Sequence, residues 1–113
     1  MLTIDKLKQF GADTADGLNR CMNNEELYLR YVKVIAEDGG YERLKAALDE
    51  GDLKKAFEEA HALKGVLANL SLGPLYKCAA DISDLLKAGT VLDYSERMSE
   101  LLKLRDELKK LCE

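Results

Sequence analysis

The feature that most constrains the fold is an apolar stripe between residues 53 and 70. Its members recur with a period of about 3.6 residues and are Leu53, Ala56, Phe57, Ala60, Leu63, Leu67 and Leu70. No segment of the chain shows the strict apolar/polar alternation that a half-buried strand requires. The stripe therefore predicts a long amphipathic helix in an all-helical protein.

Capping residues and glycines divide the rest of the chain into further helices. Asn23 with Glu26, and Asp93 with Glu96, each have the spacing of a capping box at a helix start. The expected helices lie near Thr3–Phe10 and Ala15–Met22, from Asn23 to a stop at Asp38-Gly39-Gly40, from Tyr41 to Gly51-Asp52, from Leu53 to Leu70, from Pro74 to Gly89, and from Asp93 to Leu111 or Cys112.

Long amphipathic helices joined by short turns favour an up-down antiparallel four-helix bundle. A chain of 113 residues suits one domain that can bury its own core. We expect a single helical domain over residues 1–113, with short extra helices in residues 1–22 and the bundle in residues 23–113.

Charge and hydropathy exclude several classes of function. The formal net charge of -4 and a pI near 5.1 argue against a nucleic-acid partner. The longest apolar runs are too short to span a bilayer, and no signal-peptide core follows Met1.

The three cysteines, Cys21, Cys78 and Cys112, are odd in number and lack metal-like spacing, which is typical of free packing cysteines in a reducing compartment. A cytoplasmic location with no membrane contact is expected.

The only histidine, His61, lies beside the stripe, on the side of the helix that should face solvent. Gly65, one turn further on, would cost the helix about 1 kcal/mol relative to alanine, so its small size needs another explanation. Ala68 continues the same open face, and Lys64 places an ammonium within reach of the ring. A nucleophilic imidazole that accepts a phosphoryl group needs this combination of open space and positive charge.

These residues belong to a longer pattern. Ala60-His61-Ala62-Leu63-Lys64-Gly65 is followed by Ala68-Asn69-Leu70 and Pro74-Leu75, and preceded by Gly11-Ala12-Asp13, Gly17-Leu18-Asn19-Arg20 and Asn24-Glu25-Glu26-Leu27-Tyr28. The pattern resembles the histidine-containing phosphotransfer (HPt) domains over most of the chain. That resemblance implies a four-helix bundle whose exposed histidine takes a phosphoryl group from an aspartate of one receiver domain and passes it to another. The implied function is that of an intermediate in a bacterial-type two-component phosphorelay.

The resemblance also assigns roles to individual residues. It implies that His61 is the phospho-acceptor, that Lys64 assists the phosphoryl group, and that Gly65 gives the partner access. The surface that contacts the partner should include Ala68, Lys77 and Ser83.

The turn after the histidine helix departs from the family pattern. Many family members have glycine where this chain has Ser71. Gly73 and Pro74 are therefore expected to make the turn instead.

The resemblance implies a phosphocarrier rather than an enzyme. The chain lacks the aspartate cluster that holds magnesium in receivers and has no glycine-rich ATP lid. No cofactor of its own is expected, and Mg²⁺ should come with the receiver domain. The expected partners are response-regulator receiver domains and a hybrid sensor histidine kinase, and the chain itself should be a monomer.

Two other readings of His61 compete with this one. Glu58 and His61 have the Glu-x-x-His spacing of di-iron carboxylate bundles, but such a site needs a second histidine that the chain lacks. Alternatively, the protein is a non-phosphorylated docking or adaptor bundle in which His61 is inert. Phosphorylation of His61 by a charged receiver domain would distinguish the phosphocarrier from the adaptor.

Overall fold

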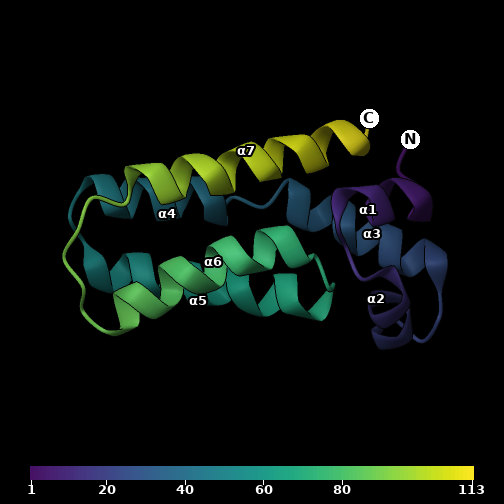
Figure 1. The fold of residues 1–113 in the computed structure, drawn as a ribbon, viewed down its shortest axis with the longest axis horizontal. Coiled ribbons are helices and arrows are strands. Elements are labelled where there is room, and N and C mark those ends of the chain that lie inside the picture. The colour runs from purple at the N-terminus through teal and green to yellow at the C-terminus, as the bar shows by residue number, and fades with distance from the viewer.

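A computed structural model describes all residues, 1–113, and consists of seven helices joined by short turns (Figure 1). The helices are α1 (Ile4–Phe10), α2 (Thr14–Arg20), α3 (Glu25–Ala36), α4 (Gly40–Asp49), α5 (Leu53–Asn69), α6 (Gly73–Lys87) and α7 (Ser95–Leu111). There is no strand, so the prediction of an all-helical protein is confirmed. None of the helices combines the length and the apolar character needed to cross a membrane.

The long helices form an up-down bundle. α5 packs most extensively against α6 and α4, and α7 packs against α6 and α3. α3 and α4 follow one another along one side, and α4, α5, α6 and α7 run alternately in opposite directions (Figure 1). The two short helices α1 and α2 lie at the end of the bundle where α5 turns into α6 (Figure 1).

The apolar stripes meet in one continuous core. On α5, four members of the predicted stripe are at most 2% exposed, whereas Leu53 and Phe57 are only half-buried. The largest fully buried side chains come from six of the seven helices and include Leu7, Tyr28, Val32, Tyr41, Leu44, Leu67, Leu75, Ile82, Leu101 and Leu108. Burial of this apolar surface is the main force that holds the bundle together.

The N-terminal helices are fastened to the α5–α6 turn by hydrogen bonds. The Tyr28 hydroxyl on α3 donates to the Leu70 carbonyl at 2.8 Å, and the Asp13 amide donates to the Ser71 carbonyl at 3.0 Å. A tyrosine hydroxyl is protonated at neutral pH and can donate, and burial raises the pKa of Tyr28 further, to about 12. The Ser71 hydroxyl also donates to the carboxylate of Asp16 on α2.

The prediction that Gly73 and Pro74 make the α5–α6 turn is wrong. Ser71, not Gly73, adopts the left-handed backbone conformation, with φ = 54°. Gly73 is the first residue of α6, and Pro74 stands in its first turn as expected. A left-handed serine costs about 1–2 kcal/mol, and the hydrogen bonds that Ser71 makes to Asp13 and Asp16 offset this cost.

Two predicted capping boxes are also wrong in detail. Asn23 has φ = 56°, and it is Asn24 that caps α3 by accepting from the Leu27 amide at 3.1 Å. α7 begins at Ser95, and Asp93 accepts from the Ser95 amide at 2.9 Å without Glu96. Asparagine tolerates the left-handed region, so adjacent asparagines can divide the turn and the cap between them.

Ion pairs join neighbouring helices of the bundle. Arg105 on α7 is 9% exposed, lies over the Tyr41 ring at 5.2 Å, and pairs with Glu42 on α4 at 2.8 Å. Arg43 pairs with Glu59 across α4 and α5, and Arg97 pairs with Asp81 across α7 and α6. The arginines therefore link α4 and α7 to neighbouring helices of the bundle.

We expect Gly17→Ala to lower the free energy of unfolding by about 1–3 kcal/mol. A Cβ at Gly17 would lie 2.6 Å from Cε1 and Cζ of Tyr28, whose ring is buried and held by its hydrogen bond to Leu70. Urea denaturation measures the change. Gly65→Ala is the matched control, because its Cβ would meet no atom within 4 Å, and it should stabilise the helix by up to about 1 kcal/mol. Equal stability of the two variants would contradict this account.

Candidate functional site

Helix α5 presents one buried and one exposed face. Its N-cap Asp52 accepts from the Lys55 amide at 3.1 Å, which fixes where the helix begins. Burial of the apolar stripe then determines which residues face outward. The buried face consists of Ala56, Ala60, Leu63 and Leu67. His61 lies on the exposed face near the middle of the helix, as the periodicity predicts.

The imidazole of His61 is held by stacking and not by hydrogen bonds. The ring is exposed and stacks on Phe57 of the preceding turn, with ring centroids 5.5 Å apart and an interplanar angle of 26°. Neither ring nitrogen takes part in any hydrogen bond of the protein. The unprotonated ring nitrogen is therefore free of any protein partner when an electrophile approaches.

The surface next to the ring is open on the side of Gly65. Gly65 is exposed, and a Cβ atom built there would meet nothing within 4 Å. Ala68, two turns on from His61, is half-buried and adds only a methyl group. The small size of both residues leaves room for another molecule to approach the imidazole.

Lys64 is the nearest cation on the next turn, and its ammonium is already engaged. Its Nζ lies 3.4 Å from Oδ1 of Asp84 on α6. The Lys64 side chain is 28% exposed and that of Asp84 is 69% exposed, so the pair lies at the surface. The sequence gives no sign of this pair, because it depends on how α5 and α6 pack.

The two α6 residues expected on the partner surface are placed differently. Ser83 is 2% exposed, which corrects the expectation that it faces a partner. It belongs to the buried stripe of α6, one helical turn after Ala79 and one before Leu86. Lys77 is exposed but makes no hydrogen bond or ion pair with the His61 face, and its role remains a prediction.

Stacking on Phe57 should limit the rotamers of His61 and prepare the ring for attack. If His61 accepts a phosphoryl group, as the resemblance implies, Phe57→Leu should slow phosphoryl transfer to the protein by about 3- to 10-fold, the kinetic equivalent of losing an aromatic pair. Phe57→Tyr keeps the stacked ring and should transfer at the wild-type rate. Initial rates with a phosphorylated receiver domain give the comparison, and equal rates for the leucine and tyrosine variants would show that the stack is irrelevant.

The Glu-x-x-His spacing does not assemble a ligand cluster. No group of three or more His, Cys, Asp or Glu side chains comes together in the arrangement that a metal ion requires. Glu59, the other acidic residue before the histidine, pairs with Arg43 at 3.1 Å.

A small cavity adjoins the exposed face of α5. It has a volume of about 240 Å³ and is lined at the α5–α6 turn by Gly11, Asp13, Leu67, Ala68, Ser71, Gly73 and Tyr76. Ala68 lines this cavity and also belongs to the open surface that His61, Gly65 and Ala68 form on α5. This open surface and the cavity are therefore continuous along α5.

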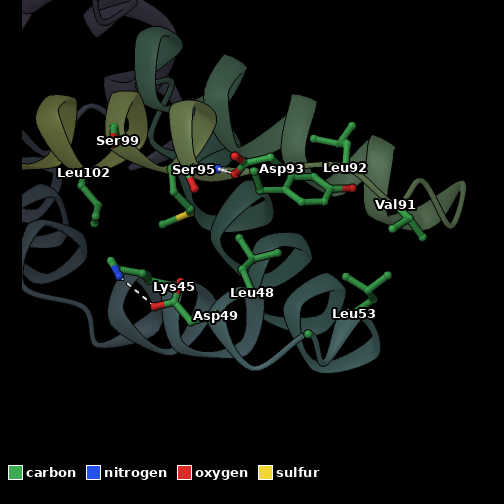
Figure 2. A pocket seen from close by; sticks show the side chains of 13 residues that line it. Lys45, Leu48, Asp49, Leu53, Val91, Leu92, Asp93, Ser95, Ser99 and Leu102 are labelled. Atoms are coloured by element: carbon green, nitrogen blue, oxygen red, sulfur yellow. Dashed lines mark hydrogen bonds and ion pairs between the residues drawn. The ribbon is translucent and has the colours of Figure 1, made fainter.

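A larger cavity of about 430 Å³ lies between α4, the α6–α7 loop and α7. Figure 2 shows Leu48 and Leu53 on one side of it and Val91 and Leu92 of the loop on the other. The Lys45–Asp49 ion pair, 2.8 Å long, lies at its edge. Neither His61 nor any neighbour on its face lines this cavity, which is therefore separate from the candidate site.

Comparison with known proteins gives one match. A family model described as the Hpt domain matches residues 40–113, about two thirds of the chain and all of α4, α5, α6 and α7. Neither a curated protein nor a solved structure matches the chain significantly. The match includes the His61 face and leaves α1, α2 and α3 outside it.

Proposed function

Because the chain belongs to the Hpt domain family, whose members are phosphocarriers in phosphorelays, we propose that His61 is the residue that carries the phosphoryl group. Its exposure on α5 supports the proposal more than any other observation. An exposed imidazole whose unprotonated nitrogen accepts no hydrogen bond from the protein can attack phosphorus without first losing a partner.

The proposed step is a reversible phosphoryl transfer from an aspartyl phosphate. The lone pair of an unprotonated ring nitrogen of His61 forms the N–P bond. The O–P bond of the aspartyl phosphate breaks at the same centre, and its electron pair leaves on the receiver's carboxylate. Transfer onward reverses these bond changes on a second receiver. No oxidant, nucleotide or water is consumed.

Within this proposal Lys64 and Gly65 have different tasks. The Lys64 ammonium stabilises the two negative charges of the phosphoryl group by a charge-assisted hydrogen bond. Gly65 and Ala68 keep the approach to the ring open for a protein donor. The 240 Å³ cavity beyond Ala68 extends this surface, which suits a modest, transient interface.

Hpt domains interact with receiver domains and histidine kinases. For this chain we propose a phosphorylated receiver as donor, a second receiver as acceptor, a hybrid sensor histidine kinase upstream, and a monomeric carrier. The magnesium ion that assists the transfer belongs to the receiver in this scheme, and His61 needs no cofactor of its own.

The proposal is tested by incubating the protein with receiver domains charged by acetyl phosphate. We expect the chain to acquire phosphate that is stable in alkali and labile in acid, the signature of phosphohistidine. A wild-type protein that remains unlabelled with several charged receivers would instead support the adaptor reading, in which the bundle only docks.

A further inference from the structure

The ion pair between Lys64 and Asp84 has no place in the step described above. That step needs the Lys64 ammonium at the phosphoryl group, yet in the unphosphorylated protein the ammonium lies 3.4 Å from the Asp84 carboxylate. In the proposed step, phosphorylation therefore draws Lys64 away from a partner that it already has.

Asp84 pairs with a lysine, whereas two other acids of α5 and α6, Glu59 and Asp81, pair with arginines. Asp81, one turn earlier on α6, is held by Arg97 at 2.8 Å, and Glu59 on α5 is held by Arg43. Asp84 pairs only with Lys64. The long contact and the exposure of both side chains make this pair weak enough to break during the reaction.

A phosphoryl group competes well for the ammonium. It carries nearly two negative charges and three acceptor oxygens, whereas Asp84 offers one charge. When Lys64 moves to the phosphoryl group, the pair is lost and the Asp84 carboxylate is left without its counter-ion. The loss of this pair raises the free energy of the phosphorylated state relative to the unphosphorylated one.

Building on the proposed function of His61, we propose that Asp84 is a positioning residue that competes with the phosphoryl group for Lys64. By this competition Asp84 makes the phosphohistidine a better donor, so that the domain passes its phosphoryl group on instead of storing it.

The test measures the equilibrium between a phosphorylated receiver and the phosphohistidine form. Asp84→Asn should shift this equilibrium toward phosphohistidine by about two- to fivefold, the strength of an exposed ion pair. Asp84→Glu keeps a carboxylate, so its equilibrium should lie closer to the wild-type value than that of Asp84→Asn. The matched control Asp81→Asn removes an exposed carboxylate from the same helix and should leave the equilibrium unchanged. At about 1 M salt, where screening acts over about 3 Å, the effect of Asp84→Asn should shrink.

A double-mutant cycle separates competition for Lys64 from a purely structural role. In a Lys64→Gln background, Asp84→Asn should no longer change the equilibrium. An equally large effect with and without Lys64 would overturn the proposal, because the carboxylate would then act on the phosphoryl group directly. Circular dichroism checks that each variant keeps the helical fold.

The outcomes also separate this inference from the proposed function. A wild-type protein that carries phosphate on His61, together with an Asp84→Asn equilibrium equal to the wild-type one, would overturn the role of Asp84 alone. A wild-type protein with no phosphate on His61 would overturn both the role of Asp84 and the proposed function of His61.

Discussion

His61→Gln is expected to abolish phosphoryl acceptance completely while leaving the fold intact. His61 is the only histidine in the chain, so no second imidazole can replace it. The side chain is exposed, makes no hydrogen bond and contacts one aromatic ring, so its loss should change the free energy of unfolding by less than about 1 kcal/mol. Transfer of labelled phosphate from a charged receiver measures acceptance, and thermal unfolding measures stability.

Glu58→Gln is the matched control for this variant. It places the same side chain one turn earlier on the exposed side of α5 and leaves His61 in place. We expect it to accept phosphate as the wild type does. Label that survives in His61→Gln would assign the acceptor to a different residue, and a Glu58→Gln variant that also loses all label would point to a general defect of α5.

The helices themselves could be predicted because local patterns determine them. The apolar residues from Leu53 to Leu70 recur with a period that places them all on one side of a helix. Pro74 stands in the first turn of α6 and Gly89 follows its end, as expected. The details that failed depend on contacts between distant segments. Ser71 takes a conformation that favours glycine because Asp13 and Asp16, more than fifty residues earlier, bind it.

The burial of Arg105 could not be predicted from the sequence either. A charged residue in a helix would be placed outside by its type alone, yet Arg105 is 9% exposed. Its burial is possible because Glu42 and Asp106 satisfy the guanidinium and the Tyr41 ring lies against it. These partners come largely from α4, and no spacing within α7 reveals them.

In the candidate site, too, some features could be predicted from the sequence and others could not. His61, Lys64 and Gly65 lie within five residues of one helix, so the helical period alone places all three on the exposed side. The period of α6 could also have placed Ser83 on the buried side, because Ala79 and Leu86 flank it at helical spacing. The Lys64–Asp84 pair could not be predicted, since it requires the register of α5 against α6.

Gly65→Gln is expected to slow transfer from a phosphorylated receiver by about tenfold or more, the cost of forcing a side chain into a packed interface. The fold should remain intact or become more stable by up to about 1 kcal/mol, because glutamine is a better helix former than glycine. The structure offers no clash within the protein, since a Cβ at Gly65 meets nothing within 4 Å. We therefore expect the loss of rate to come from the partner's approach.

Two comparisons isolate this steric effect. Val66→Gln puts the same side chain on the neighbouring, exposed residue, about 140° around the helix from His61, and should transfer at the wild-type rate. Phosphoramidate, a small phosphodonor, should phosphorylate Gly65→Gln and wild type equally fast, because it needs no space for a protein backbone. Equal slowing with both donors would mean that glutamine disturbs the imidazole itself. An unchanged rate with the receiver would mean that Gly65 does not provide the partner's access to His61.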